Sequence, residues 1–208
     1  LAMIKIAAQN ISKNFGGNQV FKEVSLSVSG GLFGIAGNNG SGKSTLLKCL
    51  ANLLKPSSGS VSWQVDGEQL KKEELYKKIG YAAPYVNLYS ELTARENLHF
   101  IARLRNLDTD SQTFTYWLEA LEVYPLLDNP FGKLSTGQQQ RVKLATALVY
   151  EPPFLFLDEP ASNLDEQGRG LINQITEHWN RSDRLLVLAS NQPRELDLCD
   201  ETISMNNY

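Results

Sequence analysis

Residues 37–45 read GNNGSGKST and carry the residue types that bind phosphate groups. They fit the pattern G-x-x-x-x-G-K-[ST], directly after an apolar run and directly before the apolar helical run LLKCLANLL. Glycines in such a loop let backbone N–H groups turn inward around phosphate oxygens, and the positive end of the following helix adds to the same site. A glycine-rich turn with a chance lysine is the alternative, which the flanking strand and helix disfavour. We therefore expect Lys43 to reach the β and γ phosphates of a nucleotide and Ser44 to bind Mg²⁺.

Two adjacent acids form a second candidate element. In FLFLDEP an apolar strand ends at Asp158 and Glu159, and ligands bind outside the carboxyl ends of strands in open α/β sheets. Adjacent strand residues point to opposite sides, so the two acids cannot share one task. Two acids that end a strand by chance are the alternative, which the presence of the phosphate loop disfavours. We expect Asp158 to bind Mg²⁺ and Glu159 to act as general base on an attacking water.

The apolar runs predict the elements that position these residues. Short buried strands alternate with helical segments, which predicts an α/β fold with a P-loop NTPase core and a mostly parallel sheet. The four main predicted strands are residues 31–37, 78–83, 153–159 and 184–190. Three earlier segments predict a small antiparallel β-subdomain: residues 4–8, 20–28 and 60–65.

A helical pattern covers residues 93–149 and opens with a capping box at Thr93 and Glu96. No convincing strand interrupts this pattern. We expect an inserted helical subdomain at about residues 85–150, within a single domain of residues 1–208 and with no further domain after the last strand.

Composition and charge restrict the function classes. The 208 residues are 42% hydrophobic with a net charge of −3, so no basic field favours a nucleic-acid partner. No run has the roughly 20 apolar residues that a membrane span needs, and the N-terminal residues lack signal-peptide features. Cys49 and Cys199 lack the spacing of metal ligands, which predicts small core residues in a reducing compartment. We expect a cytoplasmic protein.

The segment LSTGQQQR, residues 134–141, is a third candidate element. Ser135 and Gln138 form an S-x-x-Q capping box, which predicts the start of a helix that runs to Val149. A cap explains only half of the pattern. After a P-loop and shortly before FLFLDEP, the segment also resembles the LSGGQ signature of ATP-binding cassette (ABC) ATPases, with Thr136 in place of a glycine. SNLD at residues 162–165 is similar to the D-loop of that family, and Phe15 in KNFGG to its adenine-stacking aromatic residue.

This resemblance covers essentially the whole chain and implies how the site is completed. In the family, a nucleotide is held between two cassettes arranged head to tail, so Ser135, Gly137 and Gln138 of one copy would face the γ-phosphate held by the other. A lone monomer would bind ATP and hydrolyse it poorly. The residues expected to bind the nucleotide are Phe15, Gly37, Asn38, Asn39, Gly40, Ser41, Gly42, Lys43, Ser44, Thr45, Ser135, Gly137 and Gln138.

The resemblance also implies a transmembrane permease subunit as partner and a peripheral position on the inner face of the cell membrane. The second cassette is either another copy, in a homodimer, or a different chain, in a heterodimer. In the family the helical lobe docks on the permease. Two interpretations remain open for an apolar cluster at the start of this lobe, which either joins the docking surface or packs on the following helix. The cluster consists of Tyr85, Leu88, Tyr89 and Leu92.

Pro84 is the first departure from the family pattern. Family members usually carry Gln at this place after the strand IGY, where it contacts the Mg²⁺ site and reports the nucleotide state to the permease. Pro84 has no side-chain donor or acceptor, and its ring stiffens the connection into the helical lobe. Tyr85 or Asn87 would be the substitutes, but a proline that merely shapes the turn is the favoured interpretation.

Asn191 is the second departure. Family members end the strand LLVLAS with a histidine that contacts the γ-phosphate and positions the attacking water, and Asn191 stands at that place. An amide donates a hydrogen bond but has no proton that titrates near neutral pH. A catalytic contact and the start of a turn before Pro193 are both open.

The sequence thus predicts a Mg²⁺-dependent ATPase that powers transport through a separate permease, with Glu159 and Asn191 as catalytic residues and ATP and Mg²⁺ as cofactors. The alternative is a regulatory cassette in which ATP drives dimer closure and hydrolysis is slow or absent, since Pro84 and Asn191 lower the expected rate. Two further classes fit less well. A soluble ABC protein that acts on nucleic acid usually has paired cassettes or large insertions, and a P-loop kinase leaves residues 135–138 unexplained.

Overall fold

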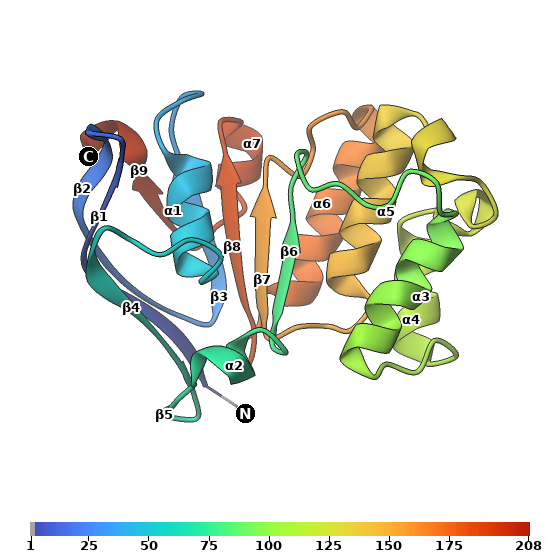
Figure 1. The fold of residues 1–208 in the computed structure, drawn as a ribbon, viewed down its shortest axis with the longest axis horizontal. Helices are drawn as coiled ribbons and strands as arrows, with labels where there is room; N and C mark the ends of the chain where they lie inside the picture. The colour runs from blue at the N-terminus through green and yellow to red at the C-terminus, as the bar shows by residue number, and fades with distance from the viewer. Residues whose placement is uncertain (1–2) are drawn as a thin grey trace.

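The computed structural model describes residues 3–208, apart from the side chains of Gln167 and Arg169. Figure 1 shows an antiparallel sheet at the left, a parallel sheet in the middle and helices at the right. The strands are β1 (Ile4–Phe15), β2 (Asn18–Ser29), β3 (Gly31–Ala36), β4 (Ser58–Val65), β5 (Glu68–Gln69), β6 (Ile79–Ala82), β7 (Phe154–Asp158), β8 (Leu185–Ser190) and β9 (Glu201–Ser204). The α-helices are α1 (Lys43–Leu50), α2 (Lys72–Leu75), α3 (Ala94–Arg105), α4 (Gln112–Ala120), α5 (Thr136–Leu148), α6 (Glu166–Trp179) and α7 (Pro193–Leu196).

The antiparallel sheet has the strand order β2-β1-β4-β5, which confirms the predicted β-subdomain. Ile4, Ile6 and Ala8 of β1 are buried, because alternate residues of a strand point to the same face. β1 extends further than predicted, since its mostly polar second half, in which Ile11 is the buried apolar residue, also pairs with β2. Asn14, for example, pairs with Gln19.

The parallel sheet has the order β6-β7-β8-β3-β9, and its first four strands in this order are the four that the sequence predicts. β7 and β8 are buried along their whole length, which is why they read as continuous apolar runs. β9 is an additional strand that was not predicted. It pairs with β3 at the edge of the sheet, and its polar, partly exposed residues show no strand pattern.

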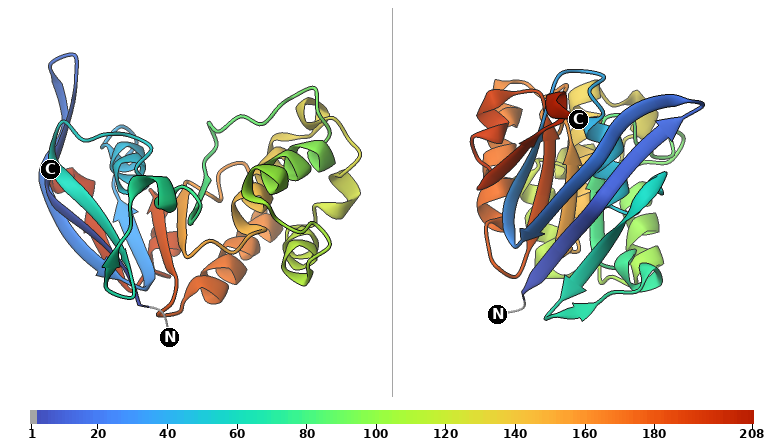
Figure 2. Two further views of the ribbon diagram at one scale, coloured as in Figure 1. Left: turned by 60° about the horizontal axis from the view of Figure 1, so that its bottom comes forward. Right: turned by 90° about the vertical axis from the view of Figure 1, so that its left-hand side faces the viewer.

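Two hydrophobic cores cover the two faces of the parallel sheet. Phe154, Phe156 and Val187 belong to the core shared with α1 and the antiparallel sheet. Leu155 and Leu157, which alternate with the two phenylalanines, belong to the core shared with the helices from α3 to α6. Figure 2 shows the parallel sheet between α1 and the antiparallel sheet on one side and the helices on the other. Burial on both faces fixes the strands in register and therefore fixes where each one ends.

Parallel strands bring their carboxyl ends to one edge of the sheet. Ala36 of β3 pairs with Ser190 of β8, and Asp158 of β7 pairs with Ala189 of β8. β6 ends beside β7. The segments that follow β3, β6, β7 and β8 therefore meet at this edge.

The segment expected to be helical holds α3, α4 and α5, and the structure describes no strand there beyond an isolated bridge. The predicted capping box at the start of α3 is confirmed. The N–H of Glu96 donates to Oγ1 of Thr93 at 3.1 Å, and Glu96 Oε2 accepts from the N–H of Thr93 at 2.7 Å. Across residues 3–208, no helix is long and apolar enough to cross a membrane.

The two cysteines are free thiols, as the sequence analysis expects of core residues. Cys49 is fully buried, and Cys199 is half-buried. Burial raises the pKa of Cys49 to about 11 and that of Cys199 to about 12, so both stay protonated at neutral pH.

Candidate nucleotide-binding site

The phosphate loop joins the end of β3 to the start of α1 and packs on β2. Gly42 precedes the helix with a φ of 96°, a left-handed conformation that favours glycine. A Cβ atom at Gly42 would lie 2.8 Å from Cγ1 of Val20, so the position has no room for a side chain. Ser44 and Thr45 follow in the first turn of α1. The first N–H groups of a helix have no partner inside it, and an anion can bind them.

The buried amine of Lys43 connects this loop to the acids at the end of β7. Its Nζ donates to the carbonyl oxygen of Asn38 at 3.1 Å. The same nitrogen lies 3.3 Å from Oε1 of Glu159. The structure therefore brings together the lysine and the carboxylate that the sequence singles out.

Asp158 is 1% exposed, and its two carboxylate oxygens have different surroundings. Oδ2 accepts a hydrogen bond from the hydroxyl of Tyr85 at 2.6 Å. Oδ1 is buried and has no hydrogen-bond partner among the described residues. A buried, unpaired carboxylate oxygen is costly, and hard cations such as Mg²⁺ bind such oxygens. The position thus fits the Mg²⁺ ligand that the sequence predicts.

Glu159 leaves the strand in another direction. Its φ is 44°, and its N–H donates to the carbonyl oxygen of Ala189 at 2.8 Å. A left-handed backbone at a residue other than glycine costs roughly 1–2 kcal/mol, and such strain gathers at functional sites. The turn aims the carboxylate of Glu159 at Lys43, while Asp158 points to Tyr85.

Two tyrosines complete the surroundings of Asp158. Tyr85 is one of the two substitutes expected for the missing glutamine, whereas no role was predicted for Tyr81. The hydroxyl of Tyr85 is hydrogen bonded to that of Tyr81, which lies on β6. Burial raises the pKa of both phenols, so they stay protonated at neutral pH. The favoured interpretation, in which Pro84 merely shapes a turn, is therefore incomplete, because the next side chain reaches the Mg²⁺ ligand. The signal that could have revealed Tyr81 was its place on the predicted strand 78–83, four residues before Tyr85.

Asn191 also reaches the phosphate loop. Its Nδ2 donates to Oδ1 of Asn39 at 3.0 Å, which ties the end of β8 to the middle of the loop. A turn starts at the same place, since the N–H of Gln192 donates to Oγ of Ser190 at 3.0 Å. The two interpretations of Asn191 are thus compatible.

Phe15 lies at the end of β1, on the hairpin beside the phosphate loop. Nζ of Lys13 lies 4.7 Å from the centroid of its ring, a cation–π distance. The same hairpin carries Val20, which limits the space at Gly42. The exposed ring of Phe15 therefore lies on a hairpin that contacts the phosphate loop through Val20.

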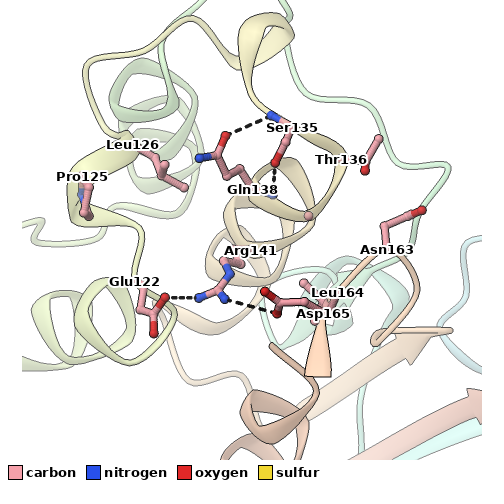
Figure 3. Close-up of a pocket in the computed structure, with 11 residues that line it drawn as sticks. Glu122, Pro125, Leu126, Ser135, Thr136, Gln138, Arg141, Asn163, Leu164 and Asp165 are labelled. Atoms are coloured by element: carbon pink, nitrogen blue, oxygen red, sulfur yellow. Dashed lines mark hydrogen bonds and ion pairs between the residues drawn. The ribbon is translucent and has the colours of Figure 1, made fainter. Parts of the chain in front are cut away.

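The signature residues line a separate pocket of about 530 Å³ (Figure 3). The N–H of Gln138 donates to Oγ of Ser135 at 3.2 Å, and Oε1 of Gln138 accepts from the N–H of Ser135 at 3.0 Å, so the predicted capping box is confirmed. A Cβ atom at Gly137 would lie 2.9 Å from the carbonyl oxygen of Asn163, in the D-loop segment. The described lining residues include none from 37–45, so a single chain does not join the signature to its own phosphate loop.

Arg141 also lines the pocket, a role that was not predicted from the sequence. Its NH1 donates to Oε2 of Glu122 at 2.6 Å, and its NH2 lies 3.9 Å from Oδ1 of Asp165. Figure 3 shows the guanidinium group between the two acids. The sequence does contain a signal for this role: Arg141 follows Gln138 by three residues and therefore lies on the same face of α5.

Known proteins that are similar in sequence to this chain are ATP-binding proteins of transporters. The family model of the ABC transporter matches residues 21–162. The chain is 34% identical over 189 residues to the cytochrome c biogenesis ATP-binding export protein CcmA of Cupriavidus pinatubonensis, covering 90% of this chain and 83% of that protein. It is 32% identical over 219 residues to the lipoprotein-releasing system ATP-binding protein LolD of Leptospira interrogans, covering 98% and 92%.

Solved structures share the fold. The ATP-binding cassette MJ0796, in a dimeric post-hydrolysis state bound to ADP and Pi, matches with a TM-score of 0.82 and 28% identity over 96% of this chain and 93% of that one. The cbiO1 protein of Clostridium perfringens, part of the ABC transporter complex cbiONQ, matches with a TM-score of 0.76 and 26% identity over 96% and 83%. The family model covers more than half of the chain, and both relatives exceed 30% identity over most of it. This chain therefore belongs to the ABC transporter family and is one of its ATP-binding cassettes.

Proposed function

We propose that this cassette hydrolyses ATP with Glu159 as general base. Its family makes it the ATP-binding subunit that energises transport by a permease. The observation that most supports hydrolysis is the 3.3 Å ion pair between Lys43 and Glu159, because it sets the phosphate-binding amine beside the candidate base. Asp158, the last residue of β7, and Asn191, which follows β8, lie at the same edge of the sheet.

Ser44 and Asp158 are the proposed Mg²⁺ ligands. The support is the buried Oδ1 of Asp158, which has no hydrogen-bond partner among the described residues, together with the Tyr85 hydroxyl that holds Oδ2. When bound, Mg²⁺ supplies positive charge to the β- and γ-phosphate oxygens.

Each remaining residue has a task in the proposed reaction. A water oxygen forms a bond to the γ-phosphorus, the bond to the ADP oxygen breaks, and the carboxylate of Glu159 accepts the water proton. Lys43 and the backbone N–H groups of residues 40–45 bind the oxygens on which negative charge increases. The amide of Asn191, which lies beside Asn39, donates a hydrogen bond to a γ-phosphate oxygen.

Replacement of Glu159 by Gln tests the base. Gln keeps the size of the side chain and removes the proton acceptor, so we expect ATP binding to persist and phosphate release to fall by about 10² to 10⁴. The measurement is phosphate release by the purified chain, with nucleotide binding by calorimetry as the control. Unchanged hydrolysis would show that another group takes the proton.

A second cassette, placed head to tail, completes the proposed site. Ser135 and Gln138 are exposed at the pocket, and the positive end of α5 lies there with them, which suits the phosphate of a nucleotide held by a partner. The dimeric cassette MJ0796 supports this arrangement by similarity. We expect the ATPase activity per chain to rise with protein concentration up to a plateau. Constant activity from the most dilute sample upward would count against a dimer in exchange with inactive monomers.

A regulatory cassette with slow hydrolysis remains the second candidate, favoured by Pro84 and by the amide of Asn191 at the place of the family histidine. Gel filtration in ATP and Mg²⁺, which measures how long the ATP-bound dimer lasts, distinguishes the transport ATPase from the regulatory cassette. If the wild-type chain forms a long-lived dimer like that expected of the Glu159→Gln variant, the regulatory function gains support. Rapid turnover without a lasting dimer excludes it.

The helical subdomain at residues 85–150, within one domain of residues 1–208, is the proposed contact to the permease at the membrane. Of the predicted apolar cluster, Leu88 packs on the core, and the hydroxyl of Tyr85 bonds to Asp158 although its side chain is partly exposed. Tyr89 is the most exposed member, at 55%. Tyr89 packs edge to face on Phe100, with 5.4 Å between ring centroids. Leu104, one turn further along α3, is 67% exposed. These three residues form the docking surface that we propose.

Leu104→Asp tests this docking surface. A charge in an apolar contact is costly to bury, so the variant should lose copurification with its permease from the native host. The exposed Arg103 of the same helix provides the matched control, and Arg103→Ala should leave copurification unchanged. Equal recovery of the permease with both variants would place the contact elsewhere.

A further inference from the structure

Tyr85 takes no part in the proposed proton transfer or phosphate transfer, yet its hydroxyl lies beside the proposed Mg²⁺ ligand. It follows Pro84, which lacks the polar side chain that family members carry beside the Mg²⁺ site. The Tyr85 hydroxyl lies 2.6 Å from Oδ2 of Asp158, a carboxylate that is almost fully buried. The side chain thus reaches the place that Pro84 leaves without a polar group.

The direction of the hydrogen bonds follows from the groups involved. An ionised carboxylate only accepts hydrogen bonds, so the hydroxyl of Tyr85 donates to Asp158. The oxygen of Tyr85 is then free to accept, and the hydroxyl of Tyr81 donates to it. This two-step chain fixes Oδ2 and leaves only Oδ1 of Asp158 for a metal or its bound water.

Two lysines hold Tyr85 and the residue before it. Nζ of Lys48, on α1, lies 4.1 Å from the centroid of the Tyr85 ring. Nζ of the buried Lys143, on α5, donates to the carbonyl oxygen of Pro84 at 2.5 Å. The segment 84–85 is therefore in contact with both α1, which follows the phosphate loop, and α5, which follows the signature.

We propose that Tyr85 is a positioning residue for the Mg²⁺ site, which orients Asp158 through its hydroxyl and takes the place of the polar side chain missing at Pro84. The inference rests on the proposed function, since it needs Asp158 to serve Mg²⁺. Groups that orient a metal ligand from behind commonly change metal affinity by 10- to 100-fold when they are removed. Tyr85 contacts Asp158 and no reacting atom, so it acts through the carboxylate.

The test is Tyr85→Phe, which keeps the ring under Lys48 and removes only the hydroxyl. ATP binding is measured by calorimetry once in EDTA and once across a Mg²⁺ series, so the readout does not depend on hydrolysis. We expect the apparent Mg²⁺ affinity in the presence of ATP to fall about tenfold. ATP affinity in EDTA should stay within error of the wild type. Tyr81→Phe should act in the same direction with a smaller effect, because it removes the donor to Tyr85 alone.

Tyr150 offers a matched control. Its hydroxyl donates to the carbonyl oxygen of Ile79 at 2.7 Å, at the other end of β6, and the guanidinium of Arg105 lies 3.9 Å from its ring centroid. Tyr150→Phe therefore removes a similar hydroxyl from a similar ring, away from Asp158, and should leave Mg²⁺ affinity unchanged. Thermal melts show whether the variants are folded to the same extent.

The possible outcomes separate this inference from the proposed function. If the wild-type chain does not bind ATP with Mg²⁺, the proposed function fails and the inference with it. If the wild type binds but Tyr85→Phe has unchanged Mg²⁺ affinity, only the role of Tyr85 is overturned. Stronger Mg²⁺ binding by Tyr85→Phe overturns it as well, because it shows that the hydroxyl competes with the cation for Asp158.

Discussion

Asn191 and Glu159 reach the phosphate loop from neighbouring strand ends, and each contacts a different residue of that loop. Glu159 faces the amine of Lys43, whereas Asn191 bonds to the side chain of Asn39. The positions of both residues at strand ends were predictable, because buried parallel strands are easy to recognise in a sequence and their carboxyl ends lie at one edge of the sheet. The sequence named Tyr85 and Asn87 as possible substitutes at Pro84 but could not decide between them, because the contact depends on how the turn at Pro84 directs one side chain.

Replacement of Asn191 by His restores the family residue at the end of β8. A histidine keeps a hydrogen-bond donor and adds an imidazole that titrates near pH 6.5, so we expect roughly tenfold faster hydrolysis and a new pH dependence around that value. Phosphate release measured across pH gives the result. Asn191→Ala, which removes the donor to Asn39, should be slower than the wild type. An unchanged rate in the His variant would show that Asn191 does not limit turnover.

Helix starts are the elements that the sequence describes most accurately. The boxes at Thr93 and Ser135 both form with the expected bonds, because capping is a local interaction between residues three apart. β9 shows the opposite case, since only its pairing with β3 makes it a strand. The ion pairs of Arg141 were likewise not predictable from local pattern, because they join α5 to segments that are distant in sequence.

The two caps allow a paired test of the signature. Ser135→Ala and Thr93→Ala each remove a side chain that accepts a hydrogen bond from a helix N–H, at a cost of about 1 kcal/mol. For a chain of this size we expect melting temperatures to fall by about 2–4 °C in both variants. Only Ser135→Ala should also lose ATPase activity, since Thr93 lies outside the proposed site. Equal loss of activity in both variants would mean that Ser135 acts as a cap alone.

Glu151 makes the start of β8 and the end of α6 sensitive to acid. Its carboxylate accepts from Arg184 NH2 at 2.5 Å and lies 2.8 Å from Nε2 of His178. Burial raises the pKa of Glu151, but the hydrogen bond and charge of Arg184, together with His178, outweigh burial and lower it. Because the folded pKa is below the unfolded value of about 4.3, the carboxylate stabilises the fold above that pH and loses this effect as the pH falls through the folded pKa.

We therefore expect Glu151→Gln to melt below the wild type at pH 7 and to approach it below about pH 4. Calorimetric melts at several pH values measure the difference. A gap that stays constant down to acid pH would show that Glu151 contributes through packing instead of charge.

One chain carries two separate parts of the proposed site, which we call half-sites: the phosphate loop with the two acids, and the signature pocket. The phosphate loop and both acids gather at the carboxyl edge of the parallel sheet, while the signature lines a pocket without any of residues 37–45. Fold class and both half-sites were predictable, since buried strands and glycine loops have strong local patterns. How two chains combine was not, because it depends on surfaces of separate molecules, and the family resemblance alone supplies that prediction.

Mixing two inactive variants tests the head-to-tail composite site most directly. Lys43→Ala removes the phosphate-binding amine, and Ser135→Ala removes the signature contact, so each variant alone should hydrolyse ATP very slowly. In a dimer of one copy of each, the intact phosphate loop of the Ser135→Ala chain meets the intact signature of the Lys43→Ala chain. We predict that phosphate release by the mixture clearly exceeds the sum of the two separate samples. Activity equal to that sum would contradict a site shared between two chains.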